Sequence, residues 1–212
     1  ALRFLKKTND PDVDAIISEQ MLEYPLLFKE LPETPCEILD FGCVEGLFPL
    51  QLCALGHKVT GMDQREYPFT HPNFKFEKAD ILTWEPPKEK YDYVLSISTV
   101  EHVGLGKYGD IAGKGGDVVA VEKLVAACKK GGKVILTVPF GKAKELEWLR
   151  VYDVDSLKKL LPDYDSLKVF AKLPNTEHWC EADPQEMSEK DTIDTKSPFP
   201  VQAFAYVAKT IK

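Results

Sequence analysis

Apolar residues form two kinds of pattern along the first 140 positions of the chain. Compact apolar runs predict strands at 36–41, 57–63, 73–78, 91–98 and 133–139. Apolar residues at helical spacing predict helices at 47–55 and 117–130. Strands that alternate with helices predict a doubly wound α/β domain, in which helices cover both faces of a mostly parallel sheet.

The two ends of the chain depart from this alternation. Residues 14–28 carry apolar side chains near helical spacing, which predicts an N-terminal helical extension over residues 1–35. Residues 166–172 and 201–209 predict two strands with no helix between them, and such a pair is expected to run antiparallel at one end of the sheet. The stretch 173–200 is rich in Pro, Glu, Asp and Ser and predicts a long loop, and loops of this length are usually functional or disordered.

Composition narrows the class of protein. The 212 residues suit a single domain over 36–212 with its extension, and 34 acidic against 27 basic residues give a net charge of −7. This balance disfavours a nucleic-acid partner, because phosphate binding relies on clustered cations. No apolar run approaches the roughly 20 residues that span a bilayer. The five scattered cysteines favour free thiols, so we expect a cytoplasmic protein.

The ends of the first three predicted strands carry the residues that point to a ligand. Gly42 allows a tight turn after the first strand, and Gly46 lets the following helix, with its unpaired N–H groups, approach a ligand. Asp40 precedes this turn, Asp63 ends the second strand and Asp80 follows the third. Asp63 suits the two hydroxyls of a ribose, and Asp80 suits an adenine amino group. An ordinary strand-to-helix turn is the alternative, and a nicotinamide-binding domain would require G-x-G-x-x-G where this turn has G-x-x-x-G.

Five segments in order resemble the motifs of the class I S-adenosylmethionine-dependent methyltransferases. They are Ile38–Gly46, Val59–Asp63, Ala79–Ile81, Tyr91–His102 and Lys130–Pro139. The resemblance covers residues 36–212 and implies a seven-stranded Rossmann-like sheet in the order 3-2-1-4-5-7-6, with an antiparallel edge strand. It implies S-adenosylmethionine as cofactor, S-adenosylhomocysteine as product, and cofactor contacts from Asp40, Gly42, Cys43, Gly46, Asp63, Asp80, Ile81 and Ser96.

Val44 departs from the family's first motif, which usually has a glycine at this position. A positive φ is costly for a β-branched residue. We therefore expect the loop to keep its course with a negative φ at Val44.

The loop after the fourth strand carries the candidate catalytic residues. His102 is a candidate general base for methyl transfer to oxygen, because an imidazole titrates near neutral pH, and Glu101 is a candidate to orient it. The alternative is that the pair caps the strand or packs against the cofactor. Lys107 and Tyr108 follow among several glycines and are candidate acceptor contacts.

Residues after the fifth strand form a candidate acceptor wall. Phe140, Trp148 and Tyr152 have aromatic faces that can stack on a sugar ring, and Arg150 can pair with a carboxylate or phosphate. The alternative places the aromatic residues in the core and Arg150 in solvent. Three runs, Gly104–Asp110, Thr137–Gly141 and Arg150–Tyr152, resemble a subgroup of methyltransferases associated with sugar and polysaccharide modification.

The leading hypothesis is methyl transfer from S-adenosylmethionine to a hydroxyl of a sugar, glycan or other small molecule. A macromolecule methyltransferase is one alternative, although neither the Asn/Asp-Pro-Pro-Tyr run nor the Pro-Cys pair of nucleic-acid enzymes follows the fourth strand. A non-catalytic S-adenosylmethionine-binding protein is another. His178 and Cys180 match no standard metal-site spacing, so no metal is predicted. The helix at 14–28 is a candidate lid or homodimer contact.

Overall fold

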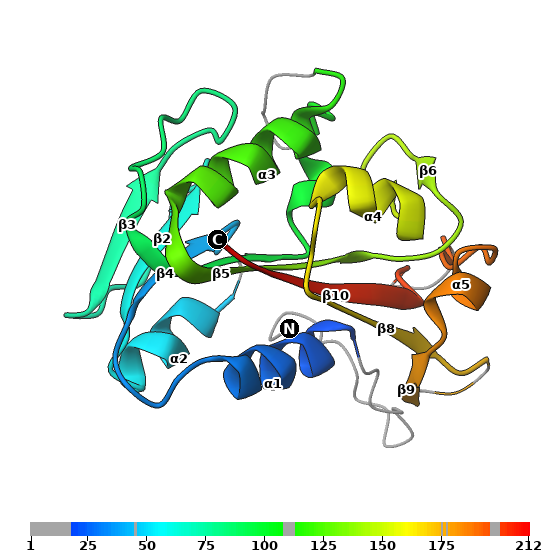
Figure 1. Ribbon diagram of the computed structural model, residues 1–212, viewed down its shortest axis with the longest axis horizontal. Helices are drawn as coiled ribbons and strands as arrows, with labels where there is room; N and C mark the ends of the chain where they lie inside the picture. Colours follow the sequence, from blue (N-terminus) through cyan, green and yellow to red (C-terminus); the bar gives the residue numbers. More distant parts are fainter. Residues whose placement is uncertain (1–17, 45, 108–112, 175, 177, 196–199) are drawn as a thin grey trace, which may run out of the picture.

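A computed structural model describes residues 18–44, 46–107, 113–174, 176, 178–195 and 200–212. Its main sheet has eight strands in the order β3-β2-β1-β4-β5-β10-β8-β9 (Figure 1). The strands are β1 Glu37–Phe41, β2 Lys58–Asp63, β3 Phe74–Lys78, β4 Tyr91–Ile97, β5 Cys128–Pro139, β8 Ser166–Lys172, β9 Trp179–Ala182 and β10 Ala203–Thr210. The first five strands pair in parallel, and β10 runs antiparallel to both β5 and β8. The predicted doubly wound α/β fold is confirmed.

Helices cover both faces of the sheet, as Figure 1 shows. The helices α1 Gln20–Glu30 and α2 Phe48–Ala54 pack on one face, and α3 Gly116–Ala127 and α4 Val154–Leu160 pack on the other. Alternate residues of the central strands serve the two faces, so that Val94 packs towards α3 while Leu95 packs towards α1 and α2. A 3-10 helix, η1 Val100–His102, follows β4, and a small second sheet pairs β6 Lys144–Glu145 with β7 Arg150–Val151.

The sequence missed two elements in the stretch 173–200, which it predicts as one loop. The strand β9 pairs antiparallel with β8 and forms the edge of the sheet, and the short helix α5 Pro184–Met187 follows it. Trp179 packs against Phe204 of β10, with ring centroids 5.7 Å apart. This four-residue strand is too short to show a clear hydrophobic pattern, so its pairing with β8 and this aromatic contact decide its structure.

The helix α1 is packed onto the domain. Its predicted range, 14–28, begins outside the described residues, and the structure extends it to Glu30. Leu27 is fully buried, and Tyr24 stacks on Phe48 of α2 at 4.6 Å. The amine of Lys133 in β5 lies 3.0 Å from the carboxylate of Glu30. These contacts hold α1 against α2 and β5.

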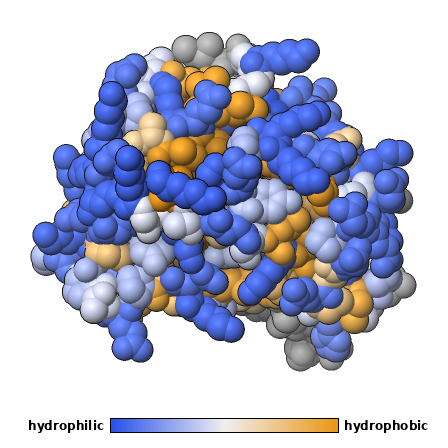
Figure 2. Space-filling view, viewed as in Figure 1, coloured by the Kyte–Doolittle hydropathy of each residue, from blue (hydrophilic) through white to orange (hydrophobic). Residues whose placement is uncertain are grey.

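The surface of the molecule is mostly polar. Figure 2 shows mostly hydrophilic side chains on the face seen in Figure 1, with hydrophobic residues between them. Within the described residues, no helix has both the length and the apolar character needed to cross a membrane.

Candidate functional site

The carboxyl ends of the central strands enclose a cavity of about 180 Å³. It is lined by Gln20, Phe41, Gly42, Val44, Asp63, Gln64, Arg65, Ile97, Ser98, Thr99, His102 and Val103. A second cavity of about 40 Å³ shares Gly42 and Val44 with the first and extends to Asp40 and Gly46. The two cavities therefore bring the turn after β1, the end of β2 and the loop after β4 together.

The turn after β1 needs glycine at position 42. Gly42 has φ +80°, and its N–H donates to the carbonyl of Met62 at 2.8 Å. A Cβ at this position would lie 2.2 Å from the side chain of Thr99. Val44 is not among the described residues with positive φ, so the predicted negative φ is confirmed. The Val44 N–H donates to Oδ2 of Asp63 at 3.2 Å and so joins the turn to β2.

Asp63 is the best-placed cofactor candidate. Its carboxylate is buried and accepts from the backbone N–H of Arg65 at 3.0 Å and from the guanidinium Nε and Nη2 at 3.2 and 3.3 Å. A ribose could bind Asp63 only by displacing this guanidinium. The Arg65 side chain is 39% exposed, so a displaced guanidinium can be solvated, while the Asp63 carboxylate, 8% exposed, would gain the ribose hydroxyls as partners. The residues present therefore fit a ribose at Asp63.

Asp40 lines the smaller cavity and is almost fully buried. Burial raises the pKa of its carboxyl to about 7, and the negative charge of Asp63 adds to the shift. Burial also raises the pKa of the Cys43 thiol, with Asp40 and Asp63 contributing. A ligand with a positive charge would offset the cost of ionising Asp40.

Three predicted cofactor residues lie away from both cavities. Asp80 accepts from the N–H of Leu82 at 2.9 Å and closes the turn after β3. Ile81 is 1% exposed and belongs to the core on the α3 face. Ser96 is fully buried in β4, and its hydroxyl has no hydrogen-bond partner among the described residues. Their cofactor contacts stay predictions.

His102 lines the main cavity with a defined ring orientation. Its Nδ1 is hydrogen-bonded to the backbone carbonyl of Trp148, and the two rings stack with centroids 6.2 Å apart. Because a carbonyl oxygen only accepts, Nδ1 carries the proton and Nε2 is the basic nitrogen of the neutral ring. Nε2 lies 3.7 Å from a carboxyl oxygen of Glu101. The structure thus brings the two predicted catalytic residues together.

Two fully buried carboxyls stand behind the cavity wall. Glu101 is 1% exposed, and burial raises its pKa well above the usual range, with the charges of Glu23 and Glu19 adding to the shift. Glu23 of α1 is 0% exposed and accepts from the Ser98 hydroxyl at 2.7 Å. Burial raises the pKa of Glu23 to about 7.

Sequence reasoning missed Glu19, Glu23 and Ser98. One signal was available, because Glu19 and Glu23 precede the buried Leu27 at intervals of four residues and therefore share its side of α1. Acidic residues on the core-facing side of a helix are unusual. The sequence did not indicate what they would face.

The predicted acceptor wall is built into the protein interior. Phe140 is fully buried in the core, and the Tyr152 hydroxyl donates to Asp117 at 2.9 Å. Arg150 is 7% exposed, donates from Nη1 to the carbonyl of Val103 at 2.7 Å, and thereby fixes the loop that carries His102. None of Phe140, Arg150 and Tyr152 lines the main cavity, so their acceptor contacts stay predictions.

The two candidate residues of the loop after η1 are less defined. Lys107 is exposed and lies outside the cavity lining. Tyr108 lies outside the described residues.

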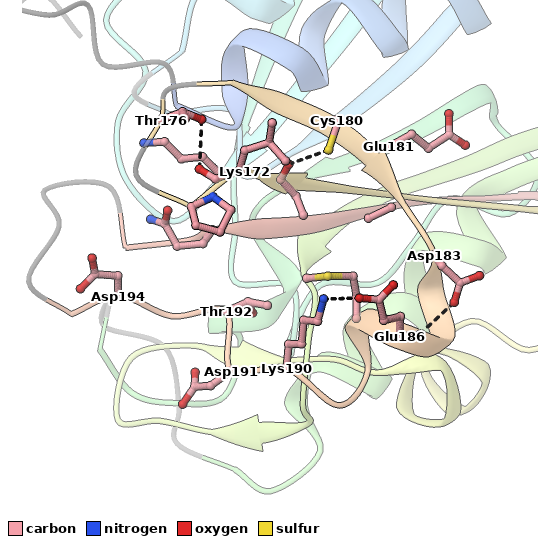
Figure 3. A pocket seen from close by; sticks show the side chains of 16 residues that line it. Lys172, Thr176, Cys180, Glu181, Asp183, Glu186, Lys190, Asp191, Thr192 and Asp194 are labelled. Atoms are coloured by element: carbon pink, nitrogen blue, oxygen red, sulfur yellow. Dashed lines mark hydrogen bonds and ion pairs between the residues drawn. The ribbon is translucent and has the colours of Figure 1, made fainter.

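A wider groove of about 1110 Å³ lies between β8, β9, α5 and the segment 190–194 (Figure 3). It is mixed in charge, and the amine of Lys190 reaches the carboxylate of Glu186. Because β8 runs parallel to β5, its last residue, Lys172, lies at the same edge of the sheet as the main cavity. Cys180 lines this groove, and within the described residues no group of three or more acidic, His or Cys side chains is arranged to hold a metal ion.

Comparison with known proteins identifies the family. A family model described as "Caenorhabditis protein of unknown function, DUF268" matches residues 75–198. The chain belongs to the DUF268 family. No curated protein matches the sequence of this DUF268 chain.

Solved structures similar to the DUF268 chain share its fold. TehB from Haemophilus influenzae has a TM-score of 0.60 and 16% identity over 99% of this chain, which spans 66% of TehB. Burkholderia thailandensis 1,6-didemethyltoxoflavin-N1-methyltransferase, with bound 1,6-didemethyltoxoflavin and S-adenosylhomocysteine, has a TM-score of 0.63 and 13% identity over 100% of this chain and 87% of its own. Haemonchus contortus phosphoethanolamine N-methyltransferase 2, in complex with S-adenosyl-L-methionine, has a TM-score of 0.59 and 14% identity. The match covers 90% of this chain and 53% of the Haemonchus chain. At these identities the likeness shows the Rossmann-like methyltransferase fold.

Proposed function

We propose that this DUF268 protein is an S-adenosylmethionine-dependent methyltransferase that methylates a hydroxyl group of a sugar, glycan or other small molecule. The observation that carries the proposal is the shared cavity. It joins a ribose-compatible carboxylate, Asp63, to an imidazole with an unprotonated Nε2, that of His102. The S-adenosylmethionine and S-adenosylhomocysteine named in two structural neighbours support the choice of cofactor.

Different residues along the carboxyl edge of the sheet would contact different parts of the cofactor. Asp63 would accept from the ribose hydroxyls, and the turn from Gly42 to Gly46, with Cys43, would border the amino-acid part. Asp40, at the smaller cavity, would face the ammonium group of that part. Asp80 and Ile81, which follow β3, would contact the adenine. Ser96 in β4 would be a further cofactor contact. When bound, S-adenosylmethionine supplies a methyl group on a sulfonium.

His102 would remove the proton of the acceptor hydroxyl. Its Nδ1–H, held by the Trp148 carbonyl, keeps Nε2 as the acceptor of that proton. Glu101 would orient the imidazole ring, since its carboxyl is 3.7 Å from Nε2. A positioned general base contributes typically 10²- to 10⁴-fold to the rate.

The proposed function is tested first by binding. Calorimetry of the intact chain with S-adenosylmethionine and S-adenosylhomocysteine should show 1:1 binding by both. Absence of binding by either, with a folded protein by circular dichroism, would overturn the proposal.

The catalytic assignment is tested by turnover. Release of S-adenosylhomocysteine is measured against a panel of free sugars and nucleotide-sugars, for the native protein and for His102→Gln. We expect the variant to lose 10²- to 10⁴-fold in rate while it keeps cofactor affinity. Equal rates would remove His102 as the base. Cofactor binding without turnover on any acceptor would support the non-catalytic alternative.

A further inference from the structure

Arg65 and Asp63 are joined at the wall of the main cavity, which both residues line. The guanidinium Nε of Arg65 donates to Oδ1 of Asp63 at 3.2 Å, and Nη2 donates to Oδ2 at 3.3 Å. One guanidinium therefore reaches both oxygens of a carboxylate whose side chain is only 8% exposed. The side chain of Arg65 thus already occupies the carboxylate that is best placed to bind the cofactor.

The two oxygens of Asp63 are bonded in the same way. Oδ1 also accepts from the backbone N–H of Arg65 at 3.0 Å, and Oδ2 also accepts from the backbone N–H of Val44 at 3.2 Å. Each oxygen therefore has one backbone donor and one guanidinium donor. A carboxylate offers about four lone-pair sites, so these four bonds fill it. A pair of ribose hydroxyls can bond to Asp63 only in the two places that the guanidinium holds.

A guanidinium and a vicinal diol present a similar pattern to a carboxylate. Each offers two donors side by side, one for each oxygen. The guanidinium of Arg65 differs in being tethered, because the backbone N–H of the same residue stays bonded to Asp63. A tethered group has a high effective concentration at its partner. The guanidinium therefore returns to Asp63 whenever a ligand leaves.

We propose that Arg65 is a built-in competitor for the ribose of the cofactor. Its guanidinium holds the diol position on Asp63 in the ligand-free protein and lowers the affinity for S-adenosylmethionine and S-adenosylhomocysteine. The inference rests on the proposed function and adds a residue that sets cofactor affinity. Ion pairs of exposed side chains change an equilibrium constant by at most about fivefold. Removal of the guanidinium should therefore tighten cofactor binding by roughly two- to fivefold.

The affinity test compares two variants that each lose one positive charge. Arg65→Met keeps an aliphatic stem but has no N–H to donate. Lys78→Met is the matched control, because Lys78 lies opposite Asp63 in the pairing of β2 with β3 and forms its ion pair with Glu66. Calorimetry with S-adenosylhomocysteine should give a Kd that is roughly two- to fivefold lower for Arg65→Met and unchanged for Lys78→Met. An unchanged or higher Kd for Arg65→Met, or equal tightening in both variants, would overturn the proposal.

A second pair of probes tests whether the competition is with the hydroxyls. Adenosine and 2′,3′-dideoxyadenosine differ only in the two ribose hydroxyls, and their affinities are measured by ligand-observed NMR. Arg65→Met should bind adenosine more tightly than the native protein does. The dideoxy compound should bind both proteins equally, because it has no hydroxyls to compete with the guanidinium. Equal tightening for the two probes would contradict competition at the diol position.

Displacement of the guanidinium can be observed directly. The sequence has three arginines, Arg3, Arg65 and Arg150, so the Nε–H signal of Arg65 is assigned in a ¹⁵N spectrum by its loss in Arg65→Met. In the native protein this signal should shift and exchange faster with water as S-adenosylhomocysteine is added, with the Kd found by calorimetry. A signal that is unaffected at saturation would overturn the proposal.

The two proposals fail in distinguishable ways. Adenosine binding that is tightened in Arg65→Met, with no binding of S-adenosylhomocysteine to either protein, would refute the proposed function alone. Binding of S-adenosylhomocysteine with the same Kd in the native protein and in Arg65→Met would refute this inference alone.

Discussion

Replacing Glu23 by Gln should make the protein less sensitive to alkaline pH. Burial raises the pKa of Glu23 from 4.5 to about 7. Below about pH 4.5 the carboxyl is protonated in both folded and unfolded chains and has no effect on the pH dependence. As pH rises from 4.5 through 7, the unfolded chain loses its proton first, so the free energy of unfolding falls, and above pH 7 the penalty levels off.

The size of this effect follows from the separation of the two pKa values. A difference of about 2.5 between 4.5 and 7 corresponds to roughly 3 kcal/mol at 1.36 kcal/mol for each unit of pKa. Most of this penalty develops between pH 5 and pH 8. The side chain is fully buried, so solvent screening does not reduce the value. Gln resembles the protonated acid and cannot ionise, so the variant should lack this part of the pH dependence.

The assay is urea denaturation at pH 5 and pH 8 for the native chain, Glu23→Gln and Glu122→Gln. The difference in unfolding free energy between native protein and Glu23→Gln should shift by about 2–3 kcal/mol between the two pH values, in favour of the variant at pH 8. Asp40 remains in both proteins, so its own titration largely cancels, whereas loss of the Glu23 charge lowers the pKa of Glu101 and adds to the shift in the same direction. Glu122→Gln, an exposed control, should show no such shift. Parallel curves for the native protein and Glu23→Gln would refute the buried, uncompensated state of Glu23.

Three further substitutions test the site. Asp63→Ala should raise the Kd for S-adenosylhomocysteine by roughly 5- to 150-fold, or 1–3 kcal/mol, as measured by calorimetry, and an unchanged Kd would remove Asp63 as the ribose residue. Gly42→Ala should lower the unfolding free energy by at least about 1–3 kcal/mol, because φ is +80° and the new Cβ meets Thr99, and a variant as stable as the native protein in urea would contradict this geometry. Tyr152→Phe should lose about 1–3 kcal/mol of stability in urea through its bond to Asp117, and a variant as stable as the native protein would contradict the importance of that bond.

The residues of the candidate site were predictable where each belongs to a short motif at the end of a strand. Gly42, Asp63 and His102 lie at or soon after the ends of parallel strands, and the carboxyl ends of such strands meet at one edge of the sheet. Their sequence positions were therefore enough to place them at one cavity. Arg150 and Tyr152 were different, because only the tertiary structure shows that they are hydrogen-bonded to the Val103 carbonyl and to Asp117.

The sequence by itself determined the order of strands and helices and the turn after the first strand. Apolar periodicity and glycine conformational freedom act over a few neighbouring residues, and both are visible without a structure. Only the tertiary structure decided that Glu23 of α1 lies beside Ser98, 75 residues away in the sequence. It also decided that the charge of Glu23 raises the pKa of Glu101. The charge of a buried carboxyl depends on the groups that surround it in three dimensions. Glu23 meets those groups only because α1 packs on one face of the sheet.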